Sequence, residues 1–267
     1  MFFRKVWGFF KRDMLEAFSY KTSFFFEGIG IFANIFTFFF VAKIVGNASP
    51  LLQAYGSYFP FVLIGIAFAG FQSIALNSFA SVVQKEQGAG TLEAILITPT
   101  RLGDVIFSGA LWDLGFATLK VLAYLLIGGL FLGVDLSHIN VVSAVVVLVL
   151  TVTALAGLGL FSAGFALVLK RGDPVNYFFN GISRFLSGVY FPVSILPLWV
   201  QKFSLFIPLT YSLEAMRMAL LEGKNIFALQ QEIICLLLFS AFFLPSGFLF
   251  FGWAINRAKK TGSLGFY

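Results

Sequence analysis

The sequence predicts an all-α polytopic membrane protein, and three observations support this fold class. The 267 residues are 59% hydrophobic and only 11% charged, whereas about a quarter of the residues of a soluble domain are charged. The mean hydropathy is +0.93. The apolar residues, among them 37 Phe, form runs that reach the roughly 20 residues of a membrane-spanning helix, rather than the short alternating segments of a β-barrel.

Six apolar runs are long enough to cross the bilayer. They define a single transmembrane domain over residues 23–256, which is preceded by an N-terminal segment (1–22) and followed by a tail (257–267). Some runs exceed the minimum length, which predicts tilted helices or helical extensions into water. The predicted spans are residues 23–45, 58–83, 105–133, 141–169, 175–196 and 228–254.

The N-terminal segment has the pattern of an amphipathic helix that lies in the membrane interface. Apolar side chains such as Phe2, Val6 and Phe10 recur at helical spacing, and basic residues take intervening positions. The segment lacks a continuous apolar core followed by small residues, so we expect it to be retained rather than cleaved as a signal peptide.

Lys and Arg are distributed unevenly along the chain. They occur in the N-terminal segment, in the loop after the second span (Lys85, Arg101), in the turn after the fourth span and in the tail, whereas loops 46–57 and 134–140 contain neither. Cytoplasmic loops carry the excess of Lys and Arg. We therefore expect a multi-pass membrane protein with an even number of spans and both termini cytoplasmic.

The apolar stretch after the fifth span contains several prolines, which argue against a seventh span. Each proline would disrupt the interior of a helix, and a seventh span would move the basic tail to the outer side. We expect residues 190–225 to form re-entrant or interfacial helices on the outer side, with Gly223 as the stop of a short amphipathic helix.

A short patterned segment, QKEQGAGTLEAILITPTR, separates the second and third spans (Gln84 to Arg101). Its glycines allow a sharp turn, and a helix is predicted over 91–98, with Thr91 as its N-cap and Pro99 as its stop. One narrow apolar face would either fill a groove in a soluble partner or rest on lipid, and periodicity alone does not decide between these. This face consists of Leu92, Ile95 and Leu96.

Motifs for nucleotide, metal or nucleophilic chemistry are missing from the sequence. There is no G-x-x-x-x-G-K-[ST] loop for phosphates and no G-x-S-x-G turn, and one His and one Cys cannot form a metal-ligand set. No basic patch with interleaved aromatic residues points to nucleic acid. We expect no catalytic site, no bound cofactor or metal, and no nucleic-acid partner.

Three charged residues at predicted membrane depth are candidates for function. Asp113 and Lys120 lie seven residues apart on one face of the third span, and Arg184 lies in the fifth. Unpaired charges at this depth are costly. These residues either line a translocation path and meet an anionic head group, or form an internal ion pair, of Asp113 with Lys120 or Arg184, that holds the third and fifth spans together.

Two stretches resemble the type-2 ABC transporter permease family (ABC-2 type). The first is similar to the family's cytoplasmic loop, which has a carboxylate, then G-T-L-E, aliphatic residues and T-P. The second, from Ser187 to Arg217, is similar to the end of the family's fifth span, with aromatic-Pro, Leu-Pro and Pro-Leu-Thr-Tyr elements. The six-span layout is similar too, so the resemblance covers nearly the whole chain. The loop match consists of Glu86, Gly90, Thr91, Leu92, Glu93, Thr98 and Pro99.

The resemblance implies the permease subunit of an ABC exporter in the bacterial inner (plasma) membrane. This subunit forms a homodimer and pairs with two copies of a separate ATPase that carries ATP and Mg. The resemblance also implies that helix 91–98 is a coupling helix in a cleft of the ATPase and that the N-terminal helix is a second contact. The coupling residues would be those of the loop match together with Ile95 and Leu96. The outer gate would involve Tyr190, Pro192, Pro197, Pro208 and Tyr211.

The expected substrate is an amphipathic molecule, such as a drug-like natural product, a lipid or a glycolipid. A polysaccharide or a lipid-linked glycan is the alternative within the same family. Two other classes compete with this interpretation, namely an ion-coupled secondary transporter and a membrane scaffold without transport. A secondary transporter predicts inverted repeats with broken helices, and the sequence contains no persuasive internal repeat.

Overall fold

The computed structural model describes residues 2–45, 57–88, 90, 102–169 and 173–261. Every regular element in these ranges is helical, in agreement with the predicted class. The longer elements are α1 (Phe2–Ser19), α2 (Lys21–Val45), α3 (Tyr58–Gly88), α5 (Leu102–Leu132), α6 (Val141–Leu169), α7 (Pro174–Leu186), α9 (Pro208–Leu220) and α10 (Gln230–Thr261). The shorter ones are η2 (Val193–Ile195), α8 (Leu198–Ser204) and η3 (Ile226–Leu229).

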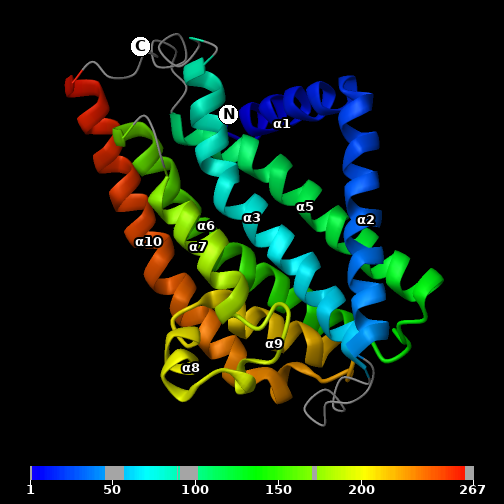
Figure 1. The fold of residues 1–267 in the computed structure, drawn as a ribbon. Helices are drawn as coiled ribbons and strands as arrows, with labels where there is room; N and C mark the ends of the chain where they lie inside the picture. The colour runs from blue at the N-terminus through cyan, green and yellow to red at the C-terminus, as the bar shows by residue number, and fades with distance from the viewer. Residues whose placement is uncertain (1, 46–56, 89, 91–101, 170–172, 262–267) are drawn as a thin grey trace.

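Five of the described helices, α2, α3, α5, α6 and α10, are long and apolar enough to cross a membrane. They run lengthwise through the molecule, and α1 lies crosswise at the end where α10 finishes (Figure 1). The short helices α8 and α9 lie at the opposite end (Figure 1). Because α3 packs on both α5 and α6, and α6 packs on α10, α3 occupies the centre of the bundle.

The fifth predicted span is shorter than expected. A helix was predicted over residues 175–196, but α7 has 13 residues, or about 20 Å, against about 30 Å for the hydrocarbon core. The chain turns at Gly188, whose φ is +78°, and Pro192 then precedes η2. The described residues therefore contain five helices of spanning length where six spans were predicted. Even so, α7 leads the chain back from the end where α6 finishes toward α8 and α9 (Figure 1).

The other predicted spans agree with observed helices, and two of these helices continue further than expected. α3 extends beyond residue 83 to Gly88, and α10 extends beyond residue 254 to Thr261. α10 passes through Pro245, which has no N–H to donate to the carbonyl of Ala241. Both extensions lie at the end where α1 lies (Figure 1), and they carry Lys85, Lys259 and Lys260 there.

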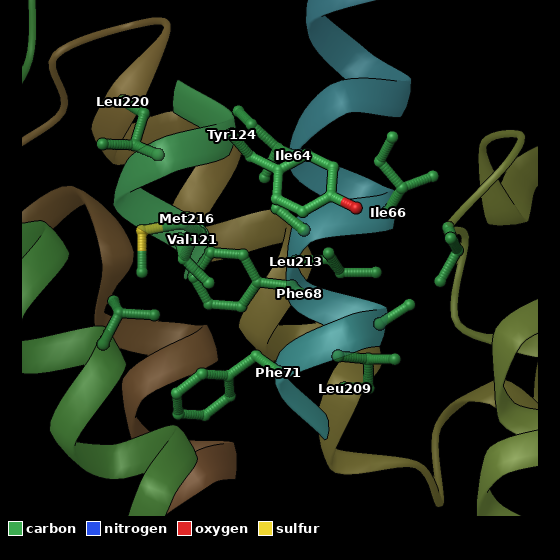
Figure 2. Packing of buried hydrophobic residues seen from close by; sticks show 14 of the residues in the cluster. Ile64, Ile66, Phe68, Phe71, Val121, Tyr124, Leu209, Leu213, Met216 and Leu220 are labelled. Atoms are coloured by element: carbon green, nitrogen blue, oxygen red, sulfur yellow. The ribbon is translucent and has the colours of Figure 1, made fainter. Parts of the chain in front are cut away.

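The apolar core surrounds the first half of α3. Phe61, Phe68 and Phe71 of α3 are each 1% exposed. Their neighbours come from α5, where Val121 and Tyr124 are buried, and from α9 (Figure 2). α9 is thus a buried element rather than a surface helix. Its core residues include Leu209, Leu213, Met216 and Leu220.

Arg217 of α9 reaches into this core and is only 4% exposed. Its guanidinium donates to the carbonyl oxygens of Phe61, at 3.1 and 3.2 Å, and Gly188, at 2.8 Å. It also lies 3.5 Å from the centroid of the Phe61 ring. A buried charge requires such partners. A Cβ on Gly65 would lie 2.1 Å from the carbonyl oxygen of Val189, so this glycine lets the turn after α7 sit directly on α3.

α6 and α10 approach closely through glycines. A Cβ on Gly157 would lie 2.4 Å from the backbone carbon of Phe243, and a Cβ on Gly247 would lie 2.5 Å from the carbonyl oxygen of Gly157. Small residues allow membrane helices to make backbone contact, which increases their van der Waals packing. These two glycines therefore set the separation of α6 and α10.

We predict that Gly157→Ala destabilises the protein by about 1–3 kcal/mol, because the added methyl group would overlap the backbone of α10. The gain in helix propensity from alanine, about 1 kcal/mol, works in the opposite direction. The midpoint of thermal unfolding in detergent measures the effect. Gly115→Ala on α5 is the matched control, since its Cβ would meet nothing within 4 Å. Equal midpoints for the two variants would contradict the close approach.

We also predict that Arg217→Met loosens the layer formed by α8 and α9. Hydrogen bonds from a charged group contribute about 1.5–3 kcal/mol each, so we expect a loss of about 2 kcal/mol or more in unfolding free energy. Trypsin should then cut faster after the exposed Lys202 of α8. Glu222→Gln is the control, because it removes only a partly exposed ion pair with Lys224. An unchanged cleavage rate in Arg217→Met would argue against this role.

Candidate functional site

A cluster of ion pairs joins α1 to the last turn of α3, immediately before the loop that contains the predicted coupling helix. A guanidinium nitrogen of Arg12 lies 3.0 Å from a carboxylate oxygen of Glu86 and 3.0 Å from one of Asp13. The ammonium nitrogen of Lys85 lies 2.7 Å from a carboxylate oxygen of Glu16 and 3.6 Å from one of Asp13. Acidic and basic residues from both helices alternate through the cluster, so α1 cannot separate from α3 without breaking several pairs at once.

Glu86 is the best-shielded member of this cluster and is 4% exposed. Its partner Arg12 is partly buried, which by itself opposes the charge, but the carboxylates of Asp13 and Glu86 outweigh this effect and raise the pKa of the guanidinium above its usual value. The Arg12 guanidinium also lies 5.1 Å from the centroid of the Phe9 ring. Arg12 thus remains charged and provides the cation that a buried Glu86 requires.

The chain turns sharply where α3 ends. Gly90 has a φ of +67°, a left-handed conformation that glycine adopts without strain, and its N–H donates to the carbonyl oxygen of Gln87 at 3.1 Å. The predicted turn at this glycine is therefore present. The remaining predicted coupling residues lie outside the described part of the chain. They are Thr91, Leu92, Glu93, Ile95, Leu96, Thr98 and Pro99.

The two charged residues predicted on one face of the third span do not pair with each other. Lys120 forms an ion pair with Glu27 of α2, and its ammonium lies 4.9 Å from the centroid of the Phe116 ring. Asp113, Lys120 and Glu27 line a cavity of about 250 Å³ beside α3. Of the alternatives for these charges, a pair of Asp113 with Lys120 is not formed in the described structure, where Glu27 provides the carboxylate and links α5 to α2.

Arg184 lies on the other side of α3, on α7, and lines a cavity of about 640 Å³ between these two helices. The described residues offer it no carboxylate partner and no hydrogen bond. The expected link from Arg184 to the third span is therefore not formed in the described structure. Instead, α7 is held to α3 by Gln72, which donates to the hydroxyl of Ser183 at 2.6 Å and to the carbonyl of Phe179 at 2.9 Å.

The second half of α3 presents a polar face between these two cavities. Asn77 and Ser81 line both of them. Ser81 also lines a third cavity, of about 300 Å³, next to the α1–α3 ion pairs. Hydrocarbon would leave such groups without hydrogen-bond partners. This face therefore suits contact with water, a polar ligand or another protein surface.

The predicted outer residues are dispersed over several contacts. The ring of Tyr190 stacks on Phe38 of α2 with centroids 5.5 Å apart. The hydroxyl of Tyr211 donates to the carbonyl oxygen of Leu205 at 3.2 Å. The three prolines each precede or begin a helical element: Pro192 precedes η2, Pro197 precedes α8 and Pro208 is the first residue of α9.

Sequence reasoning missed several residues of these sites. Asp13, Glu16 and Glu27 were not singled out as partners for the cations, and Arg217 was not recognised as buried. The carboxamides that face the cavity between α3 and α7 were also overlooked. Their spacing was a usable signal, since Asn176, Asn180 and Arg184 follow one another at intervals of four residues and so share one helix face.

We predict that the Arg12–Glu86 pair contributes more to stability than the Lys85–Glu16 pair. The side chains of Lys85 and Glu16 are 46% and 44% exposed, and exposed pairs contribute about 0–1 kcal/mol. In the Arg12–Glu86 pair the side-chain exposures are 41% and 6%, and because Glu86 is shielded we expect a coupling energy of about 1–3 kcal/mol. Double-mutant cycles with Arg12→Gln and Glu86→Gln, and with Lys85→Gln and Glu16→Gln, measure both values from unfolding free energies. Equal couplings would contradict the prediction.

Comparison with known proteins assigns the family. The model of a family described as ABC-2 type transporter matches residues 4–221. The chain is 29% identical over 232 residues to Nodulation protein J of Sinorhizobium fredii (strain NBRC 101917 / NGR234), with 78% of this chain and 86% of the relative covered. It is 27% identical over 164 residues to a Cyanophora paradoxa protein named as a transport permease, ycf38, with 60% and 54% covered. This chain therefore belongs to the ABC-2 type transporter family.

Proposed function

We propose that this chain is the transmembrane permease subunit of an ATP-driven ABC exporter, which moves an amphipathic substrate outward across the bacterial inner membrane. The family match over residues 4–221 carries the proposal, and the name of the Cyanophora paradoxa relative agrees with transport. In this proposal the chain works as a homodimer with two ATPase subunits. ATP and Mg are bound by the ATPase, which carries out hydrolysis. The chain itself contributes the translocation path and couples transport to that hydrolysis.

The α1–α3 ion pairs support a mechanical role for the loop that follows α3. A helix over residues 91–98 would begin within six residues of Lys85 and Glu86, so a force applied to it would reach them through a short segment. These two residues hold α1 through Glu16 and Arg12. α1 and α3 would then move together. The proposed transmission runs from the ATPase through the loop to this cluster, and along α3 into the bundle.

The polar half of α3 supports a path along the face between α2 and α7. The residues that line the cavities beside this face include amides, hydroxyls and charged groups, which lipid tails would leave unsatisfied. A second copy of the chain facing this side would enclose the cavities. The long apolar helix α2 suits the tail of an amphipathic substrate, and the polar groups suit its head.

The proposed orientation places the α1 end in the cytoplasm. The described basic residues at this end include Arg12, Lys85, Lys259 and Lys260, as the positive-inside rule requires. α7 would serve as the sixth crossing, completed by the turn at Gly188 and the short helices that follow. α8 and α9 would then form the outer gate, with Arg217 fixing them to the start of α3.

We predict that Leu92→Asp combined with Ile95→Asp uncouples the ATPase, because both substitutions add a carboxylate to the apolar face of the proposed coupling helix. The chain is co-expressed with its candidate ATPase, and co-purification and ATP hydrolysis are measured in lipid. We expect the ATPase to be lost from the complex, or its activity to become independent of the permease.

The matched control adds the same two carboxylates to the opposite face of the helix, as Ala94→Asp combined with Ile97→Asp. It should retain the ATPase. If the Leu92 and Ile95 variant assembles and hydrolyses ATP like the wild type, helix 91–98 rests on lipid and the proposed coupling is wrong.

A further inference from the structure

The cavity between α3 and α7 is lined mainly by polar side chains. Its volume of about 640 Å³ lies within the range of about 300–1,000 Å³ that small-molecule sites occupy. Four carboxamides line it, two from each helix, together with Arg184. The carboxamides are those of Asn77, Gln84, Asn176 and Asn180.

Three of these carboxamides form a hydrogen-bonded series that ends beside Arg184. Asn77 donates to the carbonyl oxygen of Ser73 at 2.8 Å. Asn176 donates to the side-chain oxygen of Asn77, and Asn180 donates to that of Asn176. At the end of the series the side-chain oxygen of Asn180 has no partner among the described residues. An acceptor thus remains unused at the cavity wall, one helical turn from Arg184.

Arg184 lies deep along the bundle. The neighbouring Ser183 is bonded to Gln72, which is close to the midpoint of α3 (Tyr58–Gly88). The one acid of this cavity, Asp173, is already engaged, since it caps α7 through the N–H of Asn176 and accepts from Ser162. It also precedes Arg184 by eleven residues, or about 16 Å of helix. Asp173 is therefore not a counter-ion for Arg184.

The other cations that were predicted or found in the bundle have partners. Lys120 is paired with Glu27, and Arg217 is satisfied by backbone carbonyls. Arg184 differs from both, because the described residues give it neither an ion pair nor a hydrogen bond. A cation at membrane depth without a partner is costly, and an anion that enters the cavity would remove this cost.

We propose that this cavity binds the head group of an anionic amphiphile, with Arg184 receiving the acidic group and the carboxamides receiving neighbouring hydroxyl or amide groups. A carboxamide both donates and accepts hydrogen bonds, so four of them suit a head group rich in such groups. Arginine forms strong, charge-assisted bonds to carboxylate, sulfate and phosphate. This inference rests on the proposed function, because it names the class of substrate that the permease carries.

Two alkyl sugars that differ only in the group at C6, which is charged in one and neutral in the other, test the proposal. Octyl β-D-glucuronide carries a carboxylate where octyl β-D-glucoside carries a neutral hydroxymethyl group. Their binding to the protein in phosphatidylcholine nanodiscs is measured by calorimetry below micellar concentrations, with empty nanodiscs subtracted. We expect the wild type to bind the glucuronide about tenfold or more tightly than the glucoside, because only the glucuronide can form charge-assisted hydrogen bonds with Arg184.

The variants assign this preference to one side chain. Arg184→Gln should abolish the preference while leaving the binding of the glucoside unchanged, and Arg184→Lys should retain most of it. Lys202→Gln, which removes an exposed cation of α8 that does not line this cavity, is the control and should behave like the wild type. A preference that survives in Arg184→Gln, or that is absent from the wild type, would overturn the proposal.

Free glucuronic acid separates the two possible sources of the anion. Weak binding of the free acid supports an amphiphile as the ligand, whereas binding as tight as that of the octyl glucuronide overturns the amphiphile and indicates a soluble acid. Co-purification and activity of the ATPase are recorded for the same samples. A complex that assembles and hydrolyses ATP without the charge preference contradicts this inference alone, while a chain that never binds an ATPase contradicts the proposed function.

Discussion

A charged side chain inside a layer of hydrocarbon needs a partner within reach, and three cations of the described bundle meet this need in different ways. Arg217 uses backbone carbonyls and the ring of Phe61. Lys120 uses the carboxylate of Glu27, which joins α5 to α2. Arg12, at the end of the bundle, uses Glu86. Each of these contacts holds two elements together, so the placement of charge determines much of the helix packing.

α3 connects these contacts because its two halves differ in character. The first half is surrounded by α5 and α9 in the apolar core and is held at Phe61 by Arg217. The second half carries Asn77 and Ser81 along open cavities and ends at the ion pairs of Lys85 and Glu86. One helix of 31 residues, or about 45 Å, therefore links the outer layer to the proposed coupling loop. In the proposed mechanism, a movement at either end would pass along one continuous helix rather than through a series of loops.

The sequence predicted the helices well where a single strong pattern governed the chain. Long apolar runs located α2, α3, α5, α6 and α10, and glycine chemistry located the turn at Gly90. It was less successful for α7, because apolarity continues past Leu186 while the helix ends there. Gly188 turns the chain, and the glycine at position 65 leaves space for this turn on α3. Such a close approach depends on two segments that are distant in sequence, and hydropathy carries no information about it.

The sequence by itself determined the membrane class and the positions of the long helices. It also determined which loops contain Lys or Arg and which contain neither, and the resemblance to the ABC-2 family. Each of these follows from local composition or from a short motif. Only the tertiary structure decided which charges meet. Lys120 meets Glu27 rather than Asp113, and Arg184 faces a cavity lined by carboxamides. The physical reason is that an ion pair is set by the rotation and depth of two packed helices, and periodicity defines the face of one helix without identifying the helix opposite.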